Sequence, residues 1–147
     1  MGSKLWGGRF EKPANEMLSD FLSAENTVLD QKLLPYDISG SLAHTCMLSK
    51  QKIISKAEAS EILSALLSLQ GKAFAGTFIL DPKLEDVHTN VEAAVTAATA
   101  HGKKMHTARS RNDQIALDVK MYIKEEIGDT VELLSLLQGA ILKFARN

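Results

Sequence analysis

A single cysteine, three prolines and few aromatic residues stand out as shortages in this chain of 147 residues. One cysteine excludes an internal disulfide, and because Cys46 lies in an apolar run we expect a small buried thiol in a reducing compartment. With 45% apolar residues, the chain is long enough to bury a core without a covalent staple. So few prolines favour a soluble fold rich in helix.

The sequence also has no long apolar run and no excess of one charge. No run approaches the ~20 residues that cross a bilayer, and the N-terminus lacks the apolar core of a signal peptide, so we predict no membrane partner and a cytoplasmic location. Seventeen basic and eighteen acidic side chains nearly cancel, which argues against nucleic-acid binding. Phosphate-binding glycine loops, G-x-S-x-G and C-x-x-C are absent as well.

The spacing of apolar residues predicts an all-α protein. Apolar side chains recur every three or four residues in separate segments, and Ser55 with Glu58 has the spacing of a capping box. A loop over 75–86 is expected to bury Phe78, Ile79 and Leu80. Gly102 is expected to end the helix predicted over 86–100. The predicted helices cover approximately residues 16–34, 38–48, 55–73, 86–100 and 112–147.

The last predicted helix is long for a small domain. Ile115, Val119 and Ile123 open its apolar stripe, and the helix would extend about 40 Å. Between residues 131 and 142 apolar side chains cover more than one face, as in a helix surrounded by others. We therefore expect its partners outside this chain and a chain cut close to a helix end. The alternative is a natural C-terminus with Asn147 as a cap.

The segment 103–114 is the densest polar stretch, and it lies where a loop enters the long helix. Free backbone N–H groups, the Ser110 hydroxyl and the guanidinium groups of Arg109 and Arg111 suit a carboxylate or phosphate ligand. The alternative is that Ser110 or Asn112 only caps the helix while the arginines lie in solvent. An RNA-binding patch is less favoured, because no aromatic residues interleave the charges.

A second polar stretch, residues 85–92, places His88 and Glu92 one helical turn apart, which is a possible metal-ligand spacing. No third ligand is evident, and Thr89 with Glu92 would also form a capping box, so we predict no metal site. The strip of Asp37, Ser41 and His44 is interpreted as a satisfied structural network. The other two histidines, at 101 and 106, are expected at the surface.

Four segments, taken in order, closely resemble argininosuccinate lyase over essentially the whole chain. The core of the last segment, Ser110 to Asp113, is common to the wider fumarase and aspartase superfamily, whereas the first segment points to this family. The resemblance implies an N-terminal helical lyase domain over 1–111, followed over 112–147 by the first part of a long central-bundle helix. The four segments are residues 6–10, 37–44, 85–92 and 106–114.

The resemblance also implies a function and a set of site residues. The family splits argininosuccinate into arginine and fumarate, a step of arginine biosynthesis, without cofactor or metal, and it forms homotetramers around a helical bundle. By resemblance Asn112 contacts the substrate. The residues expected to line or brace the pocket near the fumarate half are Ser110, Arg111, His88 and Asn90.

Two positions depart from the family pattern. Asn26 stands where the family commonly has serine, and its amide could replace the hydroxyl as a donor at the substrate. Ala108 stands where many members have glycine, so its methyl group could crowd the loop.

The elimination needs a base, donors for the charge that builds on a carboxylate, and an acid for the departing guanidine. The family carries its catalytic serine in a Gly-Ser-Ser loop and a catalytic histidine in a Thr-His-Leu-Gln stretch, and neither motif occurs here. By resemblance, both residues are expected beyond Asn147 in a longer protein. We therefore expect no catalytic residue in this chain and no activity from it alone.

Two other functions remain as alternatives at this point. One is a non-catalytic protein on the same scaffold, as among the lens delta-crystallins. The other is a helical binding module with a free surface over residues 131–145.

Overall fold

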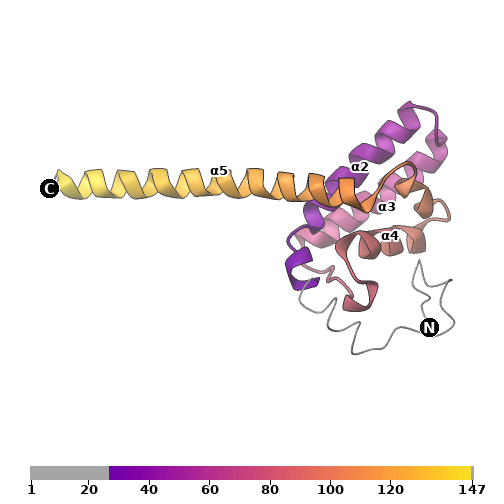
Figure 1. The fold of residues 1–147 in the computed structure, drawn as a ribbon, viewed down its shortest axis with the longest axis horizontal. Coiled ribbons are helices and arrows are strands. Elements are labelled where there is room, and N and C mark those ends of the chain that lie inside the picture. Colours follow the sequence, from indigo (N-terminus) through magenta and orange to yellow (C-terminus); the bar gives the residue numbers. More distant parts are fainter. Residues whose placement is uncertain (1–26, 147) are drawn as a thin grey trace.

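The computed structural model describes residues 27–146, and within them every regular element is a helix (Figure 1). This confirms the predicted all-α class. The α-helices are α2 (Leu34–Lys50), α3 (Lys56–Phe74), α4 (Val87–Ala98) and α5 (Arg111–Ala145), and two short 3-10 helices are η2 (Pro82–Leu84) and η3 (Gly102–His106).

The position of Pro35 determines where α2 begins. Residues 27–30 are helical, residues 31–33 form a turn, and α2 begins at Leu34 with Pro35 in its first turn, where a missing N–H costs no hydrogen bond. The predicted helix over 16–34 thus ends before Pro35 as expected, and its part before residue 27 lies outside the described residues.

Helices α2 and α3 pack against each other as an antiparallel pair joined by a short turn. The predicted capping box is confirmed, because the Ser55 hydroxyl accepts from the Glu58 backbone N–H at 3.2 Å and the Glu58 carboxylate accepts from the Ser55 N–H at 2.8 Å. Cys46 is exposed on the outer face of α2, so the expectation of a buried thiol was wrong. The reason is that Cys46 follows the buried Thr45 directly, and one step along a helix leaves the core face.

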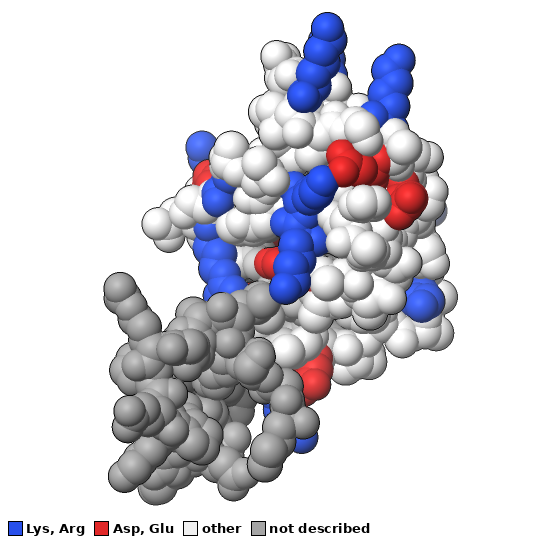
Figure 2. Space-filling model, turned by 90° about the vertical axis from the view of Figure 1, so that its right-hand side faces the viewer, with Lys and Arg blue, Asp and Glu red and all other residues white. Residues whose placement is uncertain are grey.

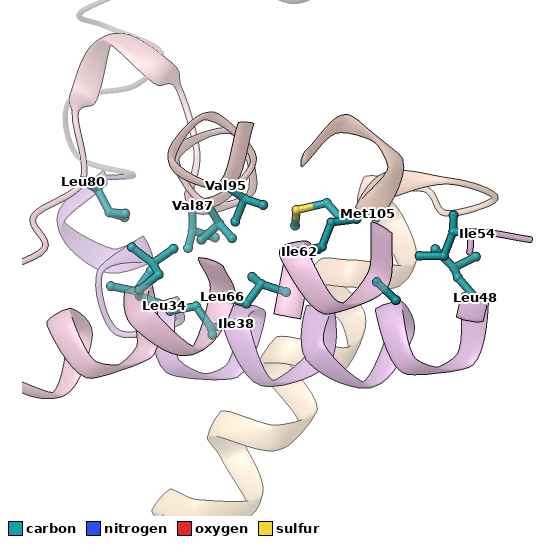
Figure 3. Packing of buried hydrophobic residues seen from close by; sticks show 13 residues of the cluster. Leu34, Ile38, Leu48, Ile54, Ile62, Leu66, Leu80, Val87, Val95 and Met105 are labelled. Atoms are coloured by element: carbon teal, nitrogen blue, oxygen red, sulfur yellow. The ribbon is translucent and has the colours of Figure 1, made fainter. Parts of the chain in front are cut away.

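Helix α4 covers the α2–α3 pair and closes the hydrophobic core (Figure 3). The loop before it contributes Leu80, whereas Ile79 is 71% exposed, so only part of the predicted loop cluster is buried. The buried apolar residues are Leu34, Ile38, Leu48, Ile54, Ala59, Ile62, Leu66, Leu69, Leu80, Val87, Val91, Val95 and Met105.

Both ends of α4 differ from the sequence-based expectation. Asp86 is the N-cap and accepts from the Thr89 N–H at 2.7 Å, so Thr89 is already helical and the predicted Thr89–Glu92 capping box was wrong. The helix ends at Ala98 with Thr99 as its C-cap, and Gly102 begins η3 instead of ending α4. A Cβ on Gly102 would lie 2.5 Å from Thr96 Cα, so this glycine serves close packing of η3 on α4.

Helix α5 is 35 residues long and extends far beyond the other helices (Figure 1). The long helix was predicted, but its buried face was not. The α5 residues that are buried are Gln114 and Asp118, whereas Ile115, Val119 and Ile123 are 37–48% exposed. The reason is that the first turns of α5 lie on a polar cluster, described below, and not on the apolar core.

Beyond its first three turns, α5 makes one lateral contact with α2, where the Tyr36 hydroxyl donates to Glu125 at 2.8 Å and the Tyr36 ring meets Tyr122 edge-on. From Ile123 to Arg146 every residue is exposed. The described helices include none with the length and apolar character to cross a membrane. The exposed large apolar residues of this stretch are Ile123, Ile127, Val131, Leu133, Leu134, Leu136, Leu137, Ile141, Leu142 and Phe144.

The far end of α5 has Arg146 as its C-cap, whose backbone N–H donates to the Lys143 carbonyl at 3.4 Å. Asn147, considered as a cap from the sequence, lies outside the described residues. The expectation that the family's catalytic serine and histidine lie beyond Asn147 is not tested by the described residues and stays a prediction.

Candidate functional site

The N-termini of α4 and α5 lie side by side, joined by Arg111. Its Nη1 donates to the Asp86 carboxylate at 2.8 Å and its Nη2 donates to the Thr89 hydroxyl at 2.9 Å. The guanidinium is therefore positioned by α4 while its side chain remains 40% exposed. The alternative that this arginine lies free in solvent was wrong. Two helix starts with their free N–H groups and partial positive charges form a region suited to an anion.

Ser110 is the N-cap of α5. Its hydroxyl accepts from the Asn112 N–H at 3.2 Å, and the Asp113 carboxylate accepts from the Ser110 N–H at 2.6 Å, which completes a capping box. The hydrogen bond from Ser110, with a smaller contribution from the Arg109 charge, lowers the pKa of Asp113. The capping role weighed for Ser110 is confirmed. Its hydroxyl hydrogen has no acceptor among residues 27–146 and stays available to a ligand.

Asn112 follows directly and its side chain is exposed, without a hydrogen-bond partner in the described part of the chain. Both its amide hydrogens and its carbonyl oxygen are therefore available at the start of α5.

The loop that precedes α5 is fixed to α2. Arg109 is 4% exposed, and its guanidinium donates to Ser41 Oγ and to the Asp113 carboxylate, both at 3.3 Å. His44 Nε2 donates to the Thr107 carbonyl at 2.9 Å. Between these anchors Ala108 has φ +56°, the left-handed region that favours glycine. From the sequence, the Ala108 methyl group was expected to crowd the loop, and the structure locates this strain in the backbone conformation of Ala108.

Asn90 is buried, and its hydrogen bonds stay within the protein. Its Oδ1 accepts from the Asp81 N–H at 2.7 Å, and its Nδ2 donates to the carbonyls of Asp81 at 3.2 Å and Asp86 at 2.9 Å. These bonds fasten the 81–86 loop onto α4. In this chain the arrangement favours the bracing role over direct contact with a ligand.

His88 lies in the first turn of α4, 6% exposed, beside two buried carboxylates. Its Nδ1 is 2.8 Å from Asp37 Oδ1 of α2 and 3.8 Å from Asp118 Oδ2 of α5. Gln114 Nε2 also donates to Asp37 Oδ1, at 3.2 Å, and Gln114 Oε1 accepts from His106 Nε2 at 2.9 Å. His106 is thus half-buried and hydrogen-bonded, contrary to the surface position expected for it.

The cluster of Asp37, His88 and Asp118 has an unusual charge balance. Burial opposes the charge on His88, but the hydrogen bond to Asp37 and the surrounding carboxylates outweigh it and raise the pKa of His88. Burial, followed by the charge of Asp37, raises the pKa of Asp118 to about 7. Since Asp37 Oδ2 and both Asp118 oxygens lack a donor in the described structure, the predicted fully satisfied network was wrong for Asp37.

Oxygen and nitrogen atoms of these three residues lie within 4.8 Å of one another, close enough to surround a cation. However, an ionised Asp37 can only accept, so His88 Nδ1 must carry a hydrogen and point it at Asp37. The nearby positive charge of Arg109 acts on Asp118 as well. The arrangement therefore favours a proton-bearing cluster over a set of metal ligands. Glu92, the partner considered for a metal from the sequence, is not part of it.

Neither of two surface hollows coincides with these helix starts. One, of about 410 Å³, lies between α3 and α4 and is lined by Glu61 and Thr99, whose hydroxyl donates to that carboxylate at 2.6 Å. The other, of about 690 Å³, lies along α2 and α3. On the face shown in Figure 2, basic side chains lie beside acidic ones.

The comparison with known proteins gives the family. A family model described as lyase matches residues 8–147. The chain belongs to this lyase family. It is similar to argininosuccinate lyases from Pelotomaculum thermopropionicum and Desulforamulus reducens, each 46% identical over 146 and 145 residues, and to one from Heliobacterium mobile, 44% identical over 148 residues.

These alignments cover 98–100% of this lyase-family chain but only 31–32% of the relatives. The chain thus spans about a third of the length of the curated relatives that it matches. The family also confirms the fold expected from the motifs, a helical lyase fold, to which α5 contributes a long helix.

Within this lyase-family chain the structure brings Ser110, Arg111, Asn112, His88 and Asn90 to the adjoining starts of α4 and α5. Asn26, also named from the sequence, lies outside the described residues. Sequence reasoning missed Asp118 and Gln114. A signal was present, because two polar residues four apart interrupt an apolar helix and so share one face.

Proposed function

We propose that the protein containing this chain is an argininosuccinate lyase, a carbon–nitrogen lyase that cleaves argininosuccinate to arginine and fumarate in arginine biosynthesis. The observation that carries the proposal is the identity of 44–46% over nearly the whole chain to relatives with that name. The activity is that of the longer protein, since the chain matches only about a third of those relatives.

In this proposal the chain supplies recognition of the fumarate half. The exposed Asn112 amide contacts the substrate, and the Ser110 hydroxyl and the Arg111 guanidinium lie beside it as donors for a carboxylate. A guanidinium carries five N–H donors, so two bonds to α4 leave others for a ligand. His88 adds a charged donor, Asn90 braces the loop, and Asn26 contributes an amide where the family commonly has serine.

The base and acid of the elimination come from parts of the protein beyond Asn147, because the family's Gly-Ser-Ser and Thr-His-Leu-Gln motifs do not occur here. Donors alone can bind a carboxylate and stabilise charge on it, but they cannot remove the proton. The chain by itself is accordingly inactive, and the reaction uses no metal or cofactor.

Assembly is the second part of the proposal. Large apolar residues cover α5 from Ile127 to Phe144 and all are exposed, an area of side chain that proteins bury against a partner. We assign that partner to equivalent helices of identical subunits, which gives a cytoplasmic homotetramer around a helical bundle.

The test is fumarate release from argininosuccinate, followed by ultraviolet absorbance, in the full-length protein that contains this chain. The informative variant is Asn112→Asp. An acidic residue near the start of a helix stabilises it, so folding is preserved while a negative charge meets the substrate carboxylate. We expect kcat/KM to fall about 100-fold or more, which corresponds to the loss of a charge-assisted donor and the gain of repulsion. Gln51→Glu, the same amide-to-acid change in the α2–α3 turn, is the matched control and should retain wild-type activity.

An active full-length protein with a silent Asn112→Asp variant of unchanged melting temperature supports the proposal. Equal activity of both variants would contradict the placement of the substrate at the start of α5. A folded full-length tetramer that releases no fumarate would favour the alternative, a non-catalytic protein on the lyase scaffold.

A further inference from the structure

Three helices bring ionisable side chains together in the interior of the protein. Asp37 from α2 and Asp118 from α5 are 0% exposed, and His88 from α4 is 6% exposed. If both carboxyl groups were ionised, Asp37 Oδ2 and both Asp118 oxygens would be buried without a donor among the described residues. A buried carboxylate without hydrogen-bond partners is strongly destabilised relative to water, so the doubly ionised form of the pair is unfavourable.

We propose that Asp37 and Asp118 share one proton and act together as positioning residues that hold His88 as an imidazolium, with its Nε2–H as the donor toward the substrate. The inference rests on the proposed function for the substrate, whereas the protonation of the cluster stands on geometry alone. A carboxyl group with one proton donates to its ionised neighbour, which gives a partner to Asp37 Oδ2 and to one of the two Asp118 oxygens.

The orientation of His88 follows from its contacts. Asp37 Oδ1 accepts from His88 Nδ1 and from Gln114 Nε2, so α5 fixes the carboxylate that fixes the ring. With Nδ1 committed, Nε2 is the remaining nitrogen, and it has no partner in the described part of the chain. A second nitrogen that donates requires the charged ring, and the adjacent carboxylates favour that form.

The charges that face the cluster agree with one shared proton. From the elements packed around it, Asp37, Asp118, Asp86 and Asp30 contribute negative charge, and His88 and Arg109 contribute positive charge. Asp86 is paired with Arg111, and Arg109 is shared with Asp113.

Asp30 is half-buried and accepts from the Val87 N–H at 3.1 Å. The remaining, fully buried groups are two carboxyls and one imidazole. One proton on the carboxyls leaves them with a single negative charge opposite the His88 cation. The pKa of Asp118, raised by burial and by Asp37 to about 7, supports that state at neutral pH and below.

The experiment is nuclear magnetic resonance of the 147-residue chain, with ¹³C-labelled aspartate and ¹⁵N-labelled histidine. The carboxyl carbon of Asp118, assigned by its loss in Asp118→Asn, is expected to report a protonated group at pH 6, about two pH units above an ordinary aspartate. His88 is expected to keep hydrogens on both nitrogens to a higher pH than an ordinary imidazole, whose pKa is about 6.5.

Two variants test separately the effect of each carboxyl group on the titration of His88. Asp37→Asn removes the acceptor, and we expect the midpoint of the His88 titration to fall by about one pH unit or more. Asp118→Asn should leave His88 charged but remove the step near pH 7 from its titration curve. Asp129→Asn, exposed on α5, is the control and should alter neither curve.

An Asp118 carboxyl that titrates near pH 4 in the wild-type chain would overturn the shared proton. A carboxyl shift that appears only when Zn²⁺ is added would also overturn it, because a cation and not a proton would then neutralise the pair. In the full-length protein, a decline in kcat/KM with rising pH that moves to lower pH in Asp37→Asn would support the positioning role. If the full-length protein releases no fumarate, the proposed function fails while the titrations still decide the protonation.

Discussion

Arg111 Nη1 lies 2.8 Å from Asp86 Oδ2, so the first residue of α5 is joined to the residue that caps α4. Asp86 and Arg111 are 25 residues apart in the sequence, and this ion pair together with the Thr89 hydrogen bond sets the relative position of the two helix starts. The candidate substrate site depends on that position.

The first prediction concerns this ion pair. Because the Arg111 side chain is 40% exposed, Arg111→Gln should lower the free energy of unfolding by only about 0.5–1 kcal/mol. Asp86→Asn keeps a helix cap and should cost a similar amount, and the double variant should cost less than the sum. Urea unfolding of all three chains measures the coupling, which should shrink at high salt. Arg146→Gln at the far end of α5 is the control; full additivity would show that the pair contributes nothing.

The second prediction concerns the loop before α5. Ala108 has φ +56°, so Ala108→Gly should relieve backbone strain and raise the free energy of unfolding by roughly 0.5–1 kcal/mol. Ala75→Gly is the matched control, because Ala75 has φ −75° and gains nothing from glycine; there we expect a loss of similar size. Thermal unfolding distinguishes the two. A destabilised Ala108→Gly chain would contradict the argument.

The third prediction concerns the packing of η3 on α4. A Cβ at Gly102 would lie 2.5 Å from Thr96 Cα and 2.6 Å from its backbone N, which cannot be relieved by a side-chain rotation. Gly102→Ala should therefore cost about 1–3 kcal/mol. Gly71→Ala in α3 meets no atom within 4 Å and should instead stabilise the chain by about 0.5–1 kcal/mol. Chemical denaturation should show a lower free energy of unfolding for Gly102→Ala and a higher one for Gly71→Ala. A decrease for both variants would refute the prediction.

The fourth prediction is a dependence of stability on pH. The pKa of Asp118 is raised to about 7 in the folded chain from an ordinary value of 3.8, so the folded chain binds a proton that the unfolded chain lacks between these values. Stability should fall as pH rises from 4 to 7. The raised pKa of His88 acts in the same direction, because its contribution is complete below 6.5 and is lost above its folded pKa.

Urea midpoints at pH 5, 6, 7 and 8 measure this slope. Each pKa unit corresponds to about 1.4 kcal/mol, so the loss from Asp118 is at most about 4 kcal/mol. Asp118→Asn should flatten the profile, whereas the exposed Asp129→Asn should follow the wild type. Parallel profiles for all three chains would show that Asp118 is not protonated in the folded state.

Features that depend on residues close in the chain were predictable from the sequence. The capping box at Ser55, the extent of the long helix and the break before Pro35 follow from hydrogen bonds and side-chain spacing over a few residues. The four segments that resemble the family are also short stretches that can be read directly from the sequence, and from them the lyase fold was predicted.

What only the tertiary structure decided is which polar groups meet. His88 and Asp37 are 51 residues apart, and Gln114 and Asp37 are 77 apart, so their contacts depend on how α2, α4 and α5 pack. The same packing explains why the buried stripe of α5 is polar. Gln114 and Asp118 lie on the face of α5 that contacts Asp37 of α2 and His88 of α4. Sequence periodicity shows which side chains share a helix face, but which face becomes buried depends on the free energy of packing all the helices together.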